Sequence, residues 1–202
     1  MSFFISSLSL GAGWSASYHA CMLGDTKICT PEVRKTVTAM MLLPFVRDYR
    51  EFYDEKYSAI CLNNKDIKDL SPLSDLYHLR SLEIRKNRIE DLTPIKNLQE
   101  LTLLDIQENK ISNLSGIEKM LKLKRLTADN NKISKLDSLE ALVSLETLNL
   151  SNNNIGDISS LHKLPELIIL DIHGNPVESQ AFDQMNGHRK LTFIDDVCLV
   201  DD

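Results

Sequence analysis

The residue types that most often carry chemistry, histidine and cysteine, are few and scattered in this chain. The histidines are His19, His78, His162, His173 and His188, and the cysteines are Cys21, Cys29, Cys61 and Cys198. No histidine stands at a metal-ligand spacing from another histidine or cysteine. Phosphate-binding glycine loops and the GxSxG and HExxH motifs are absent as well. The sequence therefore predicts no catalytic residue, no metal site and no cofactor.

The cysteines form neither a CxxC pair nor a dense framework. A chain of 202 residues can bury enough apolar surface to fold without disulfides. Cys21 and Cys29 are close enough in sequence to be bridged in an oxidising compartment. Free thiols and a cytoplasmic protein are nevertheless the default expectation.

The charge distribution favours protein partners over nucleic acid. The formal net charge is -6, and residues 168–202 carry seven acidic and two basic side chains. A nucleic-acid binder needs a basic stripe that neutralises phosphates, and no such stripe is visible in the linear sequence. An acidic surface of mixed charge suits a protein that binds other proteins.

One stretch of sequence recurs six times with a fixed period of 22 residues. The copy "LEIRKNRIEDL" (82–92) is followed by "LDIQENKISNL" (104–114), and a weaker copy, "ICLNNKDIKDL" (60–70), precedes both. Three further copies start at residues 126, 148 and 170. Repeats of 20 to 29 residues are typical of solenoids in which each unit forms one coil.

Each copy predicts the same succession of elements. The alternation of apolar and polar residues at its start predicts a short strand. An asparagine follows, at positions 87, 109, 131, 153 and 175, and its amide is expected to pair with loop backbone groups across neighbouring coils. The return segment has an apolar residue at every third position, which favours a 3₁₀-like turn. In "SPL" (71–73) and "TPI" (93–95), the Ser or Thr is expected to cap that turn.

These residues resemble the 22-residue class of the leucine-rich repeat family. The copies are similar to the repeats of the nuclear regulator of protein phosphatase-1 and of bacterial internalins. The resemblance implies an α/β solenoid: a curved right-handed coil with short parallel strands on the concave face and 3₁₀ or irregular turns on the convex face. Six repeats would span residues 57–177, and the fold would serve protein binding rather than catalysis.

The two ends differ from the repeats and are expected to cap them. Residues 30–56 predict a helical cap, with Thr30 as N-cap, Pro31 as first residue and a break at Pro44. Its residues Val33, Val37, Met40 and Met41 would cover the first coil. Residues 178–202 predict a C-terminal cap and acidic tail, in which Leu191, Phe193 and Ile194 would cover the last coil. Asp195 stands where the resemblance implies an aspartate.

Residues 1–29 form a separate N-terminal segment, and the first 24 of them carry no Asp, Glu, Lys or Arg. This segment is compatible with a tail, a cap or an export signal. Its apolar run is too short and too polar to span a bilayer, so no integral membrane segment is expected.

Function is expected on the concave face, where the strand positions that point away from the core repeat. Three columns of such positions predict a partner-binding surface that includes Glu83, Arg85, Lys86, Leu103, Asp105, Gln107, Arg125, Thr127, Asp129, Asn149, Asp171 and His173. Within it, Glu83, Asp105, Glu108 and Asp129 predict an acidic strip, which Arg80, Arg85, Lys86, Lys124 and Arg125 would border. Leu103, Ile168 and Ile169 would be small apolar anchors.

The sequence therefore predicts a non-enzymatic adaptor or regulator, monomeric by itself, that grips a protein on its concave face. One alternative is an exported bacterial effector that acts on a host protein, suggested by the uncharged N-terminus and the internalin-like "DLSPLSDL" (69–76). A second is a structural subunit of a larger assembly. A third is a phosphatase-1 regulatory subunit, against which the absence of aromatic residues from the strand face argues.

Overall fold

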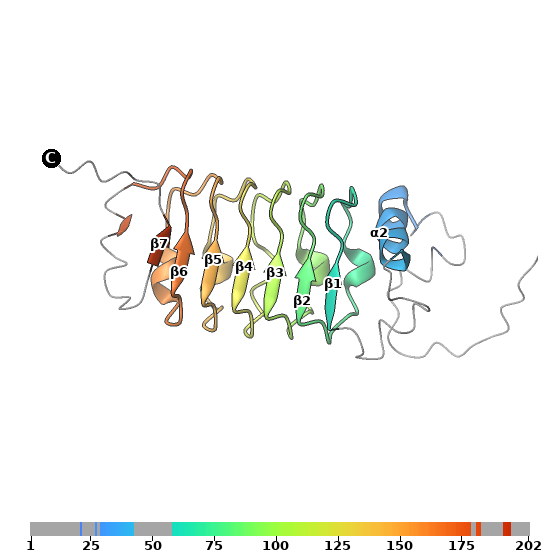
Figure 1. Ribbon diagram of the computed structural model, residues 1–202, viewed down its shortest axis with the longest axis horizontal. Helices are drawn as coiled ribbons and strands as arrows, with labels where there is room; N and C mark the ends of the chain where they lie inside the picture. Colours follow the sequence, from blue (N-terminus) through green and yellow to red (C-terminus); the bar gives the residue numbers. More distant parts are fainter. Residues whose placement is uncertain are drawn as a thin grey trace, which may run out of the picture.

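The computed structural model describes Cys21, Lys27 and residues 29–42, 58–178, 181–182 and 192–194. Within them, parallel strands form one sheet in the order of the sequence (Figure 1). The strands are β1 (Ala59–Cys61), β2 (Ser81–Glu83), β3 (Leu103–Asp105), β4 (Arg125–Thr127), β5 (Thr147–Asn149), β6 (Ile169–Asp171) and β7 (Thr192–Ile194). From β1 to β6 each residue pairs with the residue 22 positions further on, such as Leu82 with Leu104. The curved solenoid predicted from the repeats is confirmed.

Four of the described return segments form short 3₁₀ helices behind the sheet (Figure 1). They are η2 (Ser71–Leu73), η3 (Thr93–Ile95), η4 (Asp137–Leu139) and η5 (Ser159–Lys163). Their period of three brings the apolar side chains onto one side. Those side chains meet the central strand residues in a continuous core that runs from Ala39 in the N-terminal helix to Ile172 in the sixth coil. The predicted 3₁₀ turns are therefore confirmed.

The prediction that Ser or Thr caps these turns is wrong. None of the described helices η2, η3, η4 and η5 has a side-chain hydrogen bond from its N-cap residue. Instead, a side chain two residues before the turn accepts the backbone N–H, as an aspartate or asparagine readily does in an Asx turn. The pairs are Asp69 with Ser71 (2.8 Å), Asp91 with Thr93 (2.8 Å), Asn113 with Ser115 (3.0 Å) and Asp157 with Ser159 (2.8 Å).

The third return segment, in which no 3₁₀ helix forms between β3 and β4, departs from the others at Gly116. Its backbone has φ of 110°, a conformation that residues with a side chain rarely adopt. A Cβ atom at this position would lie 2.7 Å from the carbonyl oxygen of Leu92 on the preceding coil. Glycine is therefore needed here because two coils approach each other closely.

Buried or half-buried asparagines join each coil to the preceding one, as predicted. The Asn109 amide donates to the carbonyl oxygens of Ile84 (3.0 Å), Ile106 (3.0 Å) and Gln107 (3.1 Å). Its oxygen accepts the N–H of Ile89 (3.1 Å). The other members, Asn87, Asn131, Asn153 and Asn175, repeat this pattern. We call these five residues the asparagine ladder.

The residue before each ladder position adopts the left-handed conformation, which the sequence analysis did not foresee. This column comprises Lys86, Glu108, Asn130, Asn152 and Gly174, together with Asn64, which precedes Lys65 at the equivalent position of the first copy; φ lies between 52° and 68°. Asparagine and glycine tolerate that conformation better than other residues do. The chain therefore turns out of each strand at the position before the ladder asparagine.

Helix α2 (Pro31–Met41) covers the first coil. The hydroxyl of Thr30 accepts the N–H of Val33 at 3.2 Å, and Pro31 is the first helical residue. Ala39 and Met40 join the main core. The prediction that Val33 and Val37 cover the first coil is wrong, because both pack in a separate cluster against Cys21. Pro44 and the side chain of Met41 lie outside the described residues.

Cys21 and Cys29 form a disulfide, with their Cα atoms 4.7 Å apart. The expectation of free thiols is therefore wrong for this pair. Cys21 packs against Val33 and Val37 on the apolar face of α2, and this contact brings its thiol to Cys29. The sequence alone does not reveal that contact. Cys61 is free and exposed on β1.

At the other end, β7 extends the sheet beyond the six predicted repeats. Leu170 pairs with Phe193, so the last connection is one residue longer than the others. Val177, Ala181 and Phe182 pack against the core of the last coil. The predicted cap residues Leu191 and Asp195, and the side chains of Phe193 and Ile194, lie outside the described part.

We predict that Asn109→Ala lowers the free energy of unfolding by about 3 kcal/mol, because it leaves several buried backbone groups without partners. Denaturant unfolding followed by circular dichroism measures this loss. The exposed Asn97 is the control, and its change to Ala is expected to cost less than about 0.5 kcal/mol. Equal losses at both positions would contradict a special role for the ladder.

Candidate functional site

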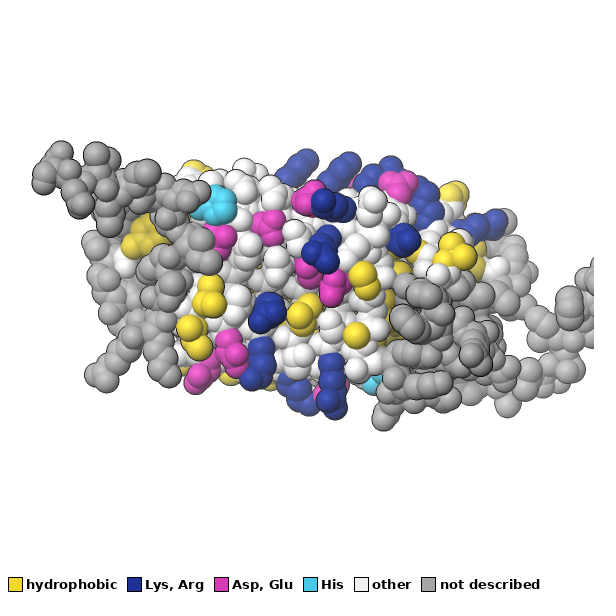
Figure 2. All heavy atoms as spheres, viewed as in Figure 1, with side chains coloured by type: hydrophobic (Ala, Val, Ile, Leu, Met, Phe, Trp, Pro, Cys, Tyr) yellow, Lys and Arg dark blue, Asp and Glu magenta, His cyan; other side chains and the backbone are white. Residues whose placement is uncertain are grey.

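The structure brings the predicted binding columns onto one face of the sheet. Strand pairing aligns the first column, which consists of Cys61, Glu83, Asp105, Thr127, Asn149 and Asp171. The column two residues further along the chain contains Asn63, Arg85, Gln107, Asp129, Ser151 and His173. Figure 2 shows acidic and basic side chains mixed over the strands rather than separated by sign.

Arg85 is the centre of a polar network over the first three coils. Its Nη2 lies 3.1 Å from Oε2 of Glu83, and its Nε lies 3.6 Å from Oδ2 of Asp105. The side chain of Asn63 accepts the N–H of Arg85 at 2.8 Å and donates to Glu83 at 3.2 Å. Gln107 donates from its side chain to both oxygens of Asp105 at 3.2 Å. Arg85 is therefore held from two sides while its side chain stays 41% exposed.

The predicted acidic strip is not a free anionic surface. Asp105 and Asp129 are both 9% exposed, and Asp129 accepts a hydrogen bond from Asn130 at 2.6 Å. Glu108 occupies the left-handed turn beyond β3 and pairs with Lys86 at 3.3 Å. The carboxylates of the strip therefore face donors from their own coil or from a neighbouring one.

Burial raises the pKa of the Asp105 carboxyl above its ordinary value. The hydrogen bonds from Gln107 and the charge of Arg85 lower that pKa, but they do not offset the burial, and the charge of Glu83 raises it further. The ionised carboxylate is thus less favourable in the folded protein than in water.

Shorter polar pairs occupy the rest of this face. Asn149 accepts hydrogen bonds from the backbone (3.0 Å) and the hydroxyl (2.9 Å) of Ser151. Nδ1 of His173 lies 2.6 Å from Oδ1 of the buried Asp171. These contacts fix side chains that would otherwise be mobile, and fixed side chains lose less entropy when a partner binds.

The third column, at the start of the strands, contains Leu103, Arg125 and Ile169, and Ile168 directly precedes its last member. Leu103 is half-buried, Arg125 is exposed, and Ile168 and Ile169 are 39% and 36% exposed. No described acidic group pairs with Arg125 at ion-pair distance. The predicted anchors Leu103, Ile168 and Ile169 are therefore reachable from solvent.

Three contributors to this face were missed by the sequence analysis: Asn63, Asn130 and Ser151. Each stands at a repeat position two or three residues after a strand. Their side chains donate hydrogen bonds to Glu83, Asp129 and Asn149, respectively, and hold those side chains in place. The 22-residue register placed Asn63 and Ser151 in a column, but it did not reveal their hydrogen bonds.

In the described part of the chain, no group of three or more His, Cys, Asp or Glu side chains could hold a metal ion. No helix among these residues is long and apolar enough to cross a membrane.

A family model described as a leucine-rich repeat region matches residues 58–197. The chain belongs to the leucine-rich repeat family. Open curved faces of such repeats generally serve as protein-interaction surfaces. No curated protein sequence matches the chain.

Solved structures of other leucine-rich repeat proteins resemble this one. Internalin F (inlF) from Listeria monocytogenes is 32% identical with a TM-score of 0.67, and the match covers 70% of this chain and 42% of that one. Internalin C2 (inlC2) from the same species is 26% identical with a TM-score of 0.60, covering 71% and 73%. A leucine-rich repeat protein from Leptospira interrogans is 22% identical with a TM-score of 0.63, covering 70% and 38%. This chain thus spans less than half of the internalin F chain.

We predict that Asp105→Asn raises the denaturant midpoint at neutral pH, because it removes a charge that burial disfavours. The gain should shrink as the pH falls through the folded-state pKa of Asp105, and it should vanish below the ordinary value of 3.8, where the wild-type group is neutral in both states. Glu83→Gln removes a more exposed charge from the same network and serves as the control. A lower midpoint for Asp105→Asn at neutral pH would show that the contact with Arg85 outweighs burial.

Proposed function

We propose that this leucine-rich repeat chain is a non-enzymatic adaptor or regulator that binds a protein partner on its concave face. The observation that carries the proposal is the ordered network around Arg85, which presents a guanidinium group that is both held in place and accessible. Arginine is among the residues that most often dominate binding energy at protein interfaces.

The surroundings of Arg85 support the same proposal. Leu103 and the exposed Arg125 lie at the starts of β3 and β4 beside the network, and the apolar Ile168 and Ile169 lie at the start of β6, three strands beyond β3. Apolar contacts next to ordered polar groups are typical of protein interfaces. The face is open and its carboxylates pair with neighbouring donors, which favours binding over catalysis.

We predict that Arg85→Ala combined with Arg125→Ala removes the partner from the set of proteins captured by the native chain. Quantitative mass spectrometry of material bound from the source extract measures this loss. The control is Lys96→Ala with Lys119→Ala, two exposed lysines outside the three binding columns. A partner that is retained by the arginine variant and lost from the lysine variant would place the binding site elsewhere.

A second candidate is an exported bacterial protein that acts on a host protein. Two observations favour it: the 32% identity to an internalin of Listeria monocytogenes and the Cys21–Cys29 disulfide. Disulfides form and persist mainly in oxidising compartments. The first candidate instead places the protein in the cytoplasm.

We predict for this second candidate that residues 1–30 carry a fused reporter enzyme out of the cell that makes the protein. Peptide mapping of the native protein, alkylated before reduction, should also recover Cys21 and Cys29 as one linked pair. A reporter that stays inside the cell, together with two alkylated thiols, would favour the cytoplasmic adaptor.

A further inference from the structure

Basic side chains gather along the edge of the solenoid where the strands end. We define this basic edge as Lys65, Lys86, Arg88, Lys110 and Lys132, which all lie in the loops that follow β1 to β4. Figure 2 shows Lys and Arg side chains along the upper margin of the sheet. The protein as a whole has a net charge of -6, so this edge differs in sign from the rest. The linear sequence hides it, because its members are about one repeat apart.

The spacing of the basic edge is set by backbone hydrogen bonds between coils. The N–H groups of Arg88, Lys110 and Lys132 donate to the carbonyl oxygens of Ile67 (2.7 Å), Ile89 (2.9 Å) and Ile111 (2.8 Å) on the preceding coils. Coils joined in this way are about 4.8 Å apart. The three cations therefore form a row with one charge on each successive coil.

Only part of this positive charge is neutralised within the protein. Nη2 of Arg88 lies 2.8 Å from Oδ2 of Asp66, which also accepts a hydrogen bond from Lys35 at 2.6 Å. Lys86 pairs with Glu108. In the described part of the chain, Lys65, Lys110 and Lys132 have no carboxylate at ion-pair distance.

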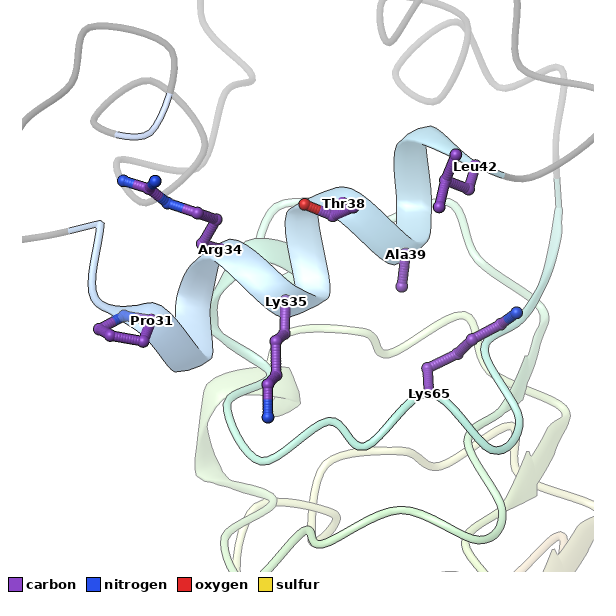
Figure 3. Close-up of a pocket in the computed structure, with 7 residues that line it drawn as sticks. All are labelled: Pro31, Arg34, Lys35, Thr38, Ala39, Leu42 and Lys65. Atoms are coloured by element: carbon purple, nitrogen blue, oxygen red, sulfur yellow. The ribbon is translucent and has the colours of Figure 1, made fainter.

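At its N-terminal end the basic edge meets an apolar hollow of about 430 Å³ between α2 and the first coil. Figure 3 shows α2 and the loop that carries Lys65 as its two sides. Its lining is formed by Pro31, Arg34, Lys35, Thr38, Ala39, Leu42 and Lys65. Leu42 is 74% exposed, so apolar surface is available in the same hollow as Lys65.

We propose that the basic edge and this hollow bind an acidic helical segment of a protein partner. A row of Asp or Glu side chains would face Lys132, Lys110 and Arg88, and an apolar side chain at one end of the helix would enter the hollow beside Leu42. The proposed contacts use Lys132, Lys110 and Arg88, none of which belongs to the columns of the concave face, so the proposal does not depend on the Arg85 site.

Spacing and charge favour a helix over other acidic ligands. Acidic residues on one helical face recur about every 5.4 Å along the axis, close to the coil spacing of about 4.8 Å. Same-face residues of an extended strand recur about every 6.6 to 6.8 Å and lose register within a few coils. Nucleic acids and anionic bilayers are large polyanions, and the acidic remainder of this chain would repel them.

The test uses two synthetic helical peptides and the full chain. One peptide has glutamates at i, i+4 and i+7 positions along one face and a leucine pair at one end, and the other replaces each Glu by Gln. We expect only the glutamate peptide to bind in fluorescence anisotropy, with affinity that falls as salt is raised. Failure of the wild-type chain to bind the glutamate peptide, or equal binding of both peptides, would overturn the proposal.

Matched variants locate the binding. Lys110→Glu with Lys132→Glu should weaken binding at least about tenfold, whereas the same charge change at Lys96 and Lys119 should leave it within about twofold. Lys110→Gln with Lys132→Gln gives a milder second variant if charge reversal disturbs folding, as judged by circular dichroism. Leu42→Ser should weaken binding of the leucine-tipped peptide alone. Unchanged binding by both edge variants would refute the assignment, as would edge-dependent binding of phosphatidylserine vesicles or duplex DNA in place of the peptide.

Discussion

The structure depends on one repeated interaction, the pairing of a buried asparagine amide with backbone groups of two successive coils. In the third repeat, Asn109 bonds to Ile84 and Ile89 of the preceding coil and to Ile106 and Gln107 of its own. No regular ladder could satisfy these backbone groups, because the chain leaves the strand at this point. A change in the length of one coil would separate an amide from its partners, which explains why the 22-residue period does not drift.

Because the coils stack in strict register, the residues at each outward position of the repeat form a column on the surface, with one residue on each successive coil. Charges are therefore compensated between coils, as in the pairs Lys122 with Glu100 at 2.6 Å and Lys124 with Glu146 at 2.7 Å. The same stacking surrounds Arg85 with carboxylates of its own and the next coil. Wherever a column lacks the opposite charge, as at Lys110 and Lys132, an uncompensated surface results.

The stacking of the coils therefore produces two surfaces that differ in how far their charges are paired and their side chains ordered. The concave face is polar, paired and ordered, so a partner meets side chains that have already lost much of their freedom. The basic edge consists of long exposed side chains whose attraction acts at a distance and is weakened by salt. The first surface is suited to specificity and the second to an increased association rate.

What the sequence by itself determined was most of what recurs: the period, the short strands, the asparagine ladder, the 3₁₀ turns and the core columns. These follow from local patterns that are repeated and therefore reinforce one another. Tertiary structure alone decided how the charges pair, since the burial of Asp105, the contacts of Arg85 and the basic edge all join residues from different coils. It also decided the ends, where no repeat provides a register: α2 divides its apolar residues between two clusters, and Cys21 meets Cys29 because helix packing brings them together.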